Sequence, residues 1–279
     1  MKTFYHLDVA RIAFKPYLKP RALDWLIRGN FNTDFYGSLG WKILEYKVFP
    51  LYIPAKHWFK PIDHLDMCRN LAELIENWNE LRRRMTEVIE DAKYPPRNVK
   101  KMLISLGRSS HSMTDVYAHS NYNELLYDYY KKDPRGAAEA GKSGLPLPEF
   151  VGKKGPLFSS FAAGGNGNYG VLRKEYLEPL IFTDECLPDV GPRSHDQINK
   201  DSPECKMASH PDYPDIFNQA MALAYRDVKG IVAEFFKQFK KQNPEKYRIL
   251  TEAFPGEMNE PGPFEKRAIY WSNKFGAYK

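Results

Sequence analysis

One segment, residues 106–122, combines a helical hydrophobic repeat with a row of metal-binding side chains. His111, Asp115 and His119 follow one another at intervals of four residues. In an α-helix each such interval returns the side chain to nearly the same face, so the three groups form one stripe. Burying imidazole and carboxylate groups is costly unless something binds them, and zinc accepts both kinds of ligand. The segment therefore predicts a helix that carries part of a zinc site.

The hydrophobic pattern predicts an all-α fold. Apolar residues recur at intervals of three and four, the period of a helix, over about 61–94, 97–117 and 214–242. Pro244 ends the third of these segments. Shorter helices are predicted over about 20–29, 33–46 and 245–254. Gly29 and Asn30 are the predicted stop between the first two of the shorter helices. Two-residue alternation, which is typical of strands, is scarce.

The length of 279 residues is compatible with one domain that spans 1–279. Within it, residues from about 134 to 212 are rich in glycine and proline and lose the helical period. Long insertions of this kind in a compact domain usually form lids or binding loops, or else are disordered. We therefore expect a multi-helix bundle with a loop-rich insertion.

Composition limits the compartment and the partners. No run approaches the roughly 20 apolar residues of a membrane span, and His6 and Asp8 interrupt the place of a signal-peptide core. We expect a protein that is cytoplasmic as synthesised, with export by a leaderless route left open. The net charge of +6 is spread along the chain and favours phosphate-bearing substrates or anionic membrane surfaces. No dedicated nucleic-acid motif is present, so no stable nucleic-acid partner is expected.

A family resemblance extends this interpretation. The segment LGRSSHSMTDVYAHSNYNEL, residues 106–125, resembles the signature of fungal heterokaryon-incompatibility Het-C proteins and their bacterial relatives. Those proteins are similar to the superfamily of zinc-dependent phospholipase C and fungal zinc nucleases, which has an all-α fold and a trinuclear zinc cluster. Shorter matches are His6 with Asp8, Gly29-Asn30 with Asp34, His64 with Asp66, and SHDQINKDSP at residues 194–203.

The resemblance implies a ligand set for up to three zinc ions. The first zinc would be held by His64, His111, Asp115 and Asp34. His119 and His195 would belong to the second zinc, and His6 would share Asp115 with the third. Asp34 would also be catalytic, because it would orient or deprotonate the attacking water.

Two departures from the superfamily pattern leave alternatives open. The secreted enzymes begin with a tryptophan whose amine binds a metal, whereas this chain begins Met1-Lys2-Thr3. They also supply an acid four residues after the histidine of the second zinc, where this chain has Asn199. Glu124, Asp196 and Asp201 are the candidates for that acid.

Two of these ligand assignments, Asp34 and His64, also have alternatives. Asp34 is also explained as a residue that interacts with the dipole of a helix N-terminus. His57 is a rival of His64 as a ligand.

The implied function is a zinc-dependent phosphodiester hydrolase with phospholipase C-like activity. Its partner would be a phospholipid or another phosphodiester, with transient contact to a membrane surface. Two alternatives remain. One is a single-strand nuclease that uses the same metals. The other is a non-catalytic self-recognition or membrane-perturbing protein that keeps metals for stability.

Overall fold

The computed structural model describes residues 3–45, 96–132, 168–169, 172–173, 195–213 and 215–254, with residue 64 and short stretches of 72–85. The long helices are α1 (Thr3–Phe14), α2 (Pro20–Glu45), α5 (Pro96–Ala118), α6 (Tyr122–Lys132) and α11 (Ile216–Gln242). Shorter elements are α10 (His195–Ile198), the 3-10 helix η3 (Lys206–Ser209) and α12 (Pro244–Thr251). Strands β1 (Asn168–Tyr169) and β2 (Leu172–Arg173) form one antiparallel pair. The described part is thus mainly helical, which confirms the predicted class.

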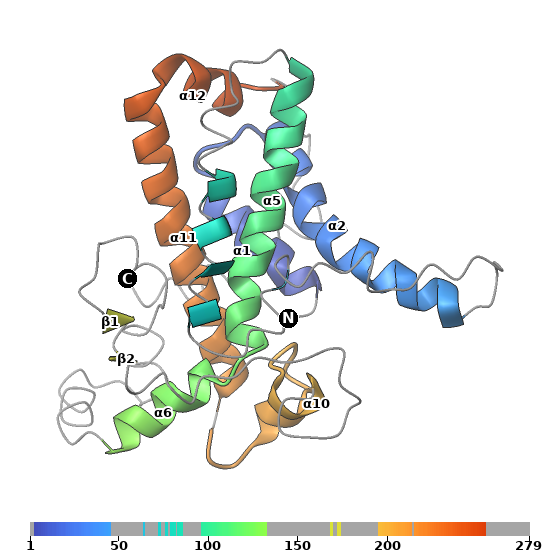
Figure 1. The fold of residues 1–279 in the computed structure, drawn as a ribbon, viewed down its shortest axis with the longest axis vertical. Coiled ribbons are helices and arrows are strands. Elements are labelled where there is room, and N and C mark those ends of the chain that lie inside the picture. Colours follow the sequence, from blue (N-terminus) through green and yellow to red (C-terminus); the bar gives the residue numbers. More distant parts are fainter. Residues whose placement is uncertain are drawn as a thin grey trace.

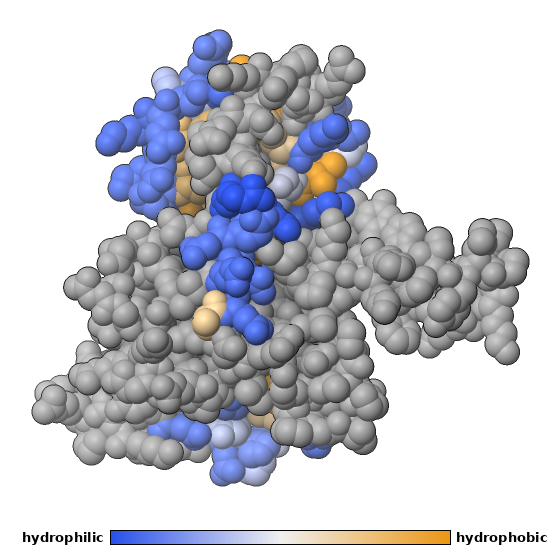
Figure 2. Space-filling view, in the orientation of Figure 1, coloured by the Kyte–Doolittle hydropathy of each residue, from blue (hydrophilic) through white to orange (hydrophobic). Residues whose placement is uncertain are grey.

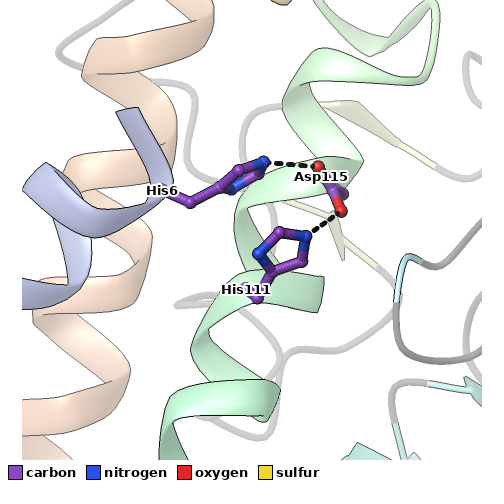
Figure 3. A group of neighbouring side chains, drawn as sticks. All are labelled: His6, His111 and Asp115. Carbon is purple, nitrogen blue, oxygen red and sulfur yellow. Dashed lines mark ion pairs between the residues drawn. The ribbon is translucent and has the colours of Figure 1, made fainter. Parts of the chain in front are cut away.

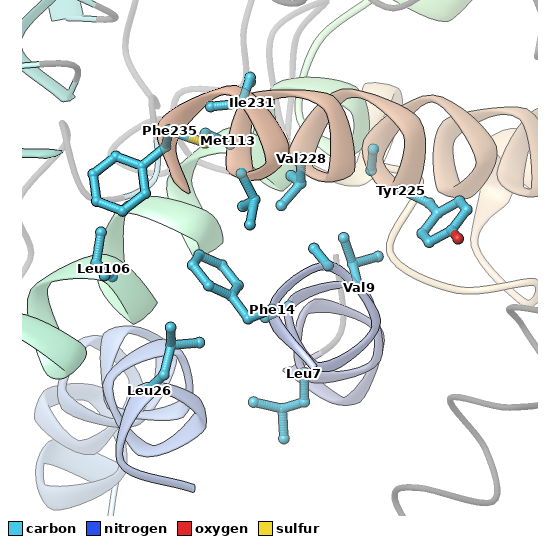
Figure 4. Packing of buried hydrophobic residues seen from close by; sticks show 14 of the residues in the cluster. Leu7, Val9, Phe14, Leu26, Leu106, Met113, Tyr225, Val228, Ile231 and Phe235 are labelled. Carbon is cyan, nitrogen blue, oxygen red and sulfur yellow. The ribbon is translucent and has the colours of Figure 1, made fainter. Parts of the chain in front are cut away.

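Four helices form the body that carries the site. Helix α5 packs against α2 and α11, and α1 contacts all three of them (Figure 1). Apolar side chains from these helices meet in one continuous core (Figure 4). Phe14 of α1 and Phe236 of α11 pack edge to face, with ring centroids 6.1 Å apart. The core therefore fixes α1 and α5 relative to each other.

Helix α1 was not predicted from the hydrophobic period. Its residues from His6 to Ala10 are all buried, and so are Ala13 and Phe14. A helix that is buried on several sides shows no single apolar stripe, so the three-and-four pattern is weak. Two polar residues of this helix, His6 and Asp8, are 0% and 1% exposed.

The predicted stop at Gly29 and Asn30 is wrong, because α2 runs without a break from Pro20 to Glu45. The glycine serves a close helix contact instead. A Cβ atom at Gly29 would lie 2.3 Å from the backbone oxygen of Ile104 in α5. A Cβ atom at Gly107 would lie 2.0 Å from the backbone oxygen of Leu26. Only glycine lets α2 and α5 approach this closely.

The predicted helix over 214–242 corresponds to α11, and the one over 245–254 corresponds to α12. Within 61–94 the residues that the structure describes are helical. Of the predicted insertion over 134–212, the described residues hold only β1, β2, α10 and η3. None of the described helices combines the length and the apolar character needed to cross a bilayer. The described surface in Figure 2 is mostly hydrophilic.

Candidate metal centre

Two of the predicted metal ligands, His111 and Asp115, lie in the buried C-terminal half of α5. His111 and Asp115 are 0% and 1% exposed, and the helix reaches Ala118. The Nε2 atom of His111 lies 3.1 Å from Oδ2 of Asp115. The helical repeat therefore places two potential ligands side by side in the core.

Two histidines from other segments join this pair. His6 on α1 places Nε2 3.0 Å from Oδ1 of Asp115, and its ring lies 3.9 Å from that of His111 (Figure 3). His64 places Nδ1 3.2 Å from Oδ2 of Asp115. One ligand atom each from His6, His111 and Asp115 lies within 4.8 Å of the others. We call these four residues the central cluster: His6, His64, His111 and Asp115.

Thr114 fixes the orientation of the His6 ring. Its hydroxyl donates to the backbone oxygen of His111 at 2.7 Å. The same hydroxyl is joined by a hydrogen bond to Nδ1 of His6, so it holds the ring while Nε2 faces Asp115. A second hydrogen bond that holds the ring in this way is typical of metal-binding histidines.

The electrostatics of the cluster favour a neutral His6 beside an ionised Asp115. Burial lowers the pKa of His6 to about 4, and nearby His111 acts in the same direction. Burial would raise the pKa of Asp115, but the attraction of His6 and His111 holds it well below its usual range. Nε2 of His6 and Oδ1 of Asp115 then lie 3.0 Å apart. This nitrogen and this oxygen could share a bound cation.

The spacing of the cluster fits a bound cation. Ligand atoms that share one tetrahedral zinc at 2.0–2.2 Å are about 3.4 Å apart. The nitrogen-to-oxygen distances around Asp115 are 3.0, 3.1 and 3.2 Å, so a small outward movement would admit the ion. The two carboxylate oxygens also face different imidazoles, as a bridging carboxylate requires. The described residues can therefore hold at least one metal ion.

His119 and Glu124 lie just beyond this cluster and have partners of their own. His119 follows the last turn of α5, and its Nε2 lies 2.8 Å from Oδ1 of Asp201. Burial lowers the pKa of His119, but Asp201 and Asp115 outweigh this and raise it well above its usual value. Glu124 on α6 places Oε1 2.8 Å from Nζ of Lys200. The structure thus separates these two predicted ligands into two ion pairs.

Other predicted site residues lie outside the described side chains. Asp34 is on α2 and His195 begins α10, but only their backbones are described. The same holds for Asp196, and His57 lies outside the described residues altogether. Their roles stay predictions.

Sequence reasoning did not identify two residues of the site region, Thr114 and Lys200. Thr114 lies three residues after His111, where a threonine hydroxyl commonly bonds the preceding turn of its own helix, so spacing alone gave no signal. Lys200 lies in the segment INKDS, and its side chain is 0% exposed. Only the fold reveals what these side chains contact.

His6 stays neutral to a lower pH in the folded chain than in the unfolded chain. The unfolding free energy of the chelator-treated protein is therefore expected to depend on pH. The unfolded chain takes up a proton at this histidine near pH 6.5, and the folded chain does so only near pH 4. The contribution of His6 to the unfolding free energy is therefore expected to fall by about 3 kcal/mol as the pH drops from 6.5 to 4. His119 adds little once the pH is below about 6, because it is then mostly protonated in both states.

Urea denaturation at several pH values measures this effect. His6→Gln is the control, and it should flatten the dependence between pH 6.5 and 4. Equal slopes for the two proteins would show that His6 does not carry the effect.

Comparison of the chain with protein-family models, with curated proteins and with solved structures finds no match. The functional argument consequently depends on the residues themselves.

Proposed function

We propose that this chain is a zinc-dependent phosphodiester hydrolase of the phospholipase C-like type, related to the Het-C proteins and sharing the fold of their superfamily. The observation that carries the proposal is the central cluster. Three imidazoles surround one buried carboxylate, with nitrogen-to-oxygen distances of 3.0–3.2 Å. Imidazole and carboxylate ligands suit zinc among the divalent metals, and the resemblance favours it over copper, iron or nickel.

The way in which the ligands are delivered supports a metal role over a purely structural one. They come from α1, from α5 and from residue 64, which are far apart in the sequence. A core that needed only packing would place apolar side chains at this junction, because each buried polar group costs free energy unless it is paired. Instead, Thr114 holds the His6 ring with Nε2 toward the carboxylate.

Asp34 remains the proposed catalytic base. It follows Asn30 on α2 by one helical turn, so the two positions share a face of the helix. The side chain of Asn30 donates a hydrogen bond to Ser110, the neighbour of His111, at 3.0 Å. This face of α2 is therefore directed toward the part of α5 that carries the cluster.

Each group has a defined contribution to hydrolysis. A bound zinc supplies a Lewis acid that activates water and stabilises charge on phosphoryl oxygens. His6, His64 and His111 would hold it, Asp115 would orient their nitrogen atoms and supply negative charge, and Asp34 would accept a proton from water at the site. The net charge of +6 assists the approach of an anionic substrate. The preference for a lipid substrate is supported by the family resemblance.

The test uses the zinc-loaded full chain with phosphatidylcholine vesicles and single-stranded DNA as competing substrates. We expect release of the phosphorylated headgroup, its loss after chelation, and its return when zinc is added back. Preferential cleavage of the DNA would favour the single-strand nuclease over the phospholipase C-like activity. Zinc binding without cleavage across a broad phosphodiester panel would favour the non-catalytic alternative.

A further inference from the structure

The outer sides of α2 and α5 meet in one continuous surface. The two helices lie side by side (Figure 1) and approach closely where Gly29 contacts Ile104. Trp25 of α2 also contacts Lys100 of α5, whose Nζ lies 3.5 Å from the centre of the indole ring. Solvent-facing side chains of the two helices are therefore neighbours, although about 75 residues of sequence separate them.

Positive charge dominates this surface. Five cations lie on the outer side of the two helices, four of them exposed and Lys100 half-buried: Arg21, Arg28, Lys100, Lys101 and Arg108. Over residues 20–31 and 99–108, Asp24 is the one acid, and it pairs with Arg28 at 3.1 Å. Five cations and one acid leave these two stretches with a net charge of +4. A surface of this kind attracts anions.

Two aromatic side chains accompany the cations. Phe31 is 39% exposed, which is unusual for a large apolar side chain among the described residues. Trp25 is half-buried, and the guanidinium carbon of Arg28 lies 4.6 Å from the centre of its ring. Aromatic rings next to arginine and lysine are typical of surfaces that bind at the headgroup level of a bilayer. We call the five cations, Trp25 and Phe31 together the basic face.

The contacts of Trp25 favour a bilayer over a nucleic acid. Single-stranded nucleic acid binds such surfaces by stacking its bases on open aromatic rings. Lys100 and Arg28 lie over the ring of Trp25, so a base could stack there only after a cation had moved away. Lipid phosphates pair with the cations themselves, and each cation near an anionic bilayer raises the affinity about fivefold.

We propose that the basic face binds the surface of an anionic phospholipid bilayer. The choice of a lipid partner rests on the proposed function, because the contact would hold the chain on the surface that contains its substrate. The binding itself requires no hydrolysis. It can therefore be measured separately from activity.

Co-sedimentation of the full chain with vesicles tests the inference. Vesicles of phosphatidylcholine alone are compared with vesicles of phosphatidylcholine mixed with phosphatidylserine. The wild-type chain should bind the mixed vesicles more tightly, and added salt should weaken this binding. The triple variant Arg21→Gln, Lys101→Gln and Arg108→Gln should bind them about 100-fold more weakly, because it lacks three cations worth about fivefold each.

The matched control is the triple variant Lys237→Gln, Lys240→Gln and Lys241→Gln. These lysines are also exposed and lie at the C-terminal end of α11, so the control has the same net charge as the first variant. Its binding should stay close to that of the wild type. All substitutions are at exposed side chains, so both variants should fold, and circular dichroism checks this.

Two outcomes would overturn the inference. One is wild-type binding by the basic-face variant, and the other is an equal loss of binding in both triple variants. Binding of a single-stranded oligonucleotide in place of the vesicles would replace the bilayer with a nucleic acid as the partner.

Headgroup release from the same vesicles separates this inference from the proposed function. Release together with binding that ignores the basic-face substitutions would overturn the inference alone. Binding that depends on the basic face, with no release by the zinc-loaded wild type, would support the inference and overturn the hydrolase.

Discussion

Replacing Asp115 with alanine is expected to remove at least one zinc equivalent from the purified chain and to lower phosphodiester hydrolysis at least about 100-fold. The reason is the position of this carboxylate. Its two oxygens lie 3.0–3.2 Å from nitrogen atoms of His6, His64 and His111, so a single substitution removes the group that all three share. Elemental analysis and headgroup release measure the two effects.

Two further variants separate a metal effect from a folding effect. Asp115→Asn keeps the size of the side chain and removes its charge, and it should also lose zinc. Asp227→Asn is the matched control, because Asp227 is equally buried at 1% exposure but accepts a hydrogen bond from Tyr117 at 2.5 Å. This control should keep its zinc. Unchanged zinc in Asp115→Ala would refute the central cluster as a metal site.

Lys200→Met is expected to destabilise the fold by about 3–5 kcal/mol. The substitution removes the ammonium group that bonds Ser120, Ile198 and Glu124, and it leaves a carboxylate at 10% exposure without its cation. Breaking one partner of a buried ion pair is costly for this reason. The unfolding free energy from chemical denaturation measures the loss.

The control for this prediction is Lys206→Met. Lys206 donates to Gln197 at 2.8 Å in an exposed contact, so its loss should change stability by no more than about 0.5 kcal/mol. The double variant Lys200→Met with Glu124→Gln should recover part of the loss, because the uncompensated charge is gone. Equal effects of Lys200→Met and Lys206→Met would show that burial of Lys200 contributes nothing.

The helical class was predictable from the sequence because the apolar residues of α5 and α11 recur with the helical period. Helix α1 was missed because it is buried on several sides. The break expected at Gly29 was wrong because the same residue type serves both to end a helix and to let two helices approach closely. Whether Gly29 ends the helix or allows a close contact depends on its packing against Ile104, which the sequence does not show.

Only part of the site was predictable from residue spacing. Spacing predicts contacts between residues that are close in the sequence, but it does not predict contacts between distant segments. His111 and Asp115 lie one turn apart on one helix, so their proximity follows from spacing alone. His6 and His64 were predicted from the family resemblance, and only packing of separate segments brings them to Asp115. The pairing of Asp201 with His119, and of Lys200 with Glu124, depends on how the segment after α10 lies against α5.

The hydrogen bond between His6 and Thr114 spans 108 residues of chain. A cation shared by His6 and Asp115 would close that same long loop, in the manner of a removable cross-link. Docking of the first helix and uptake of the ion would then be a single coupled equilibrium. Scarcity of the metal would loosen the amino-terminal helix before the rest of the bundle, which makes that helix the place where proteases would begin to digest the metal-depleted chain.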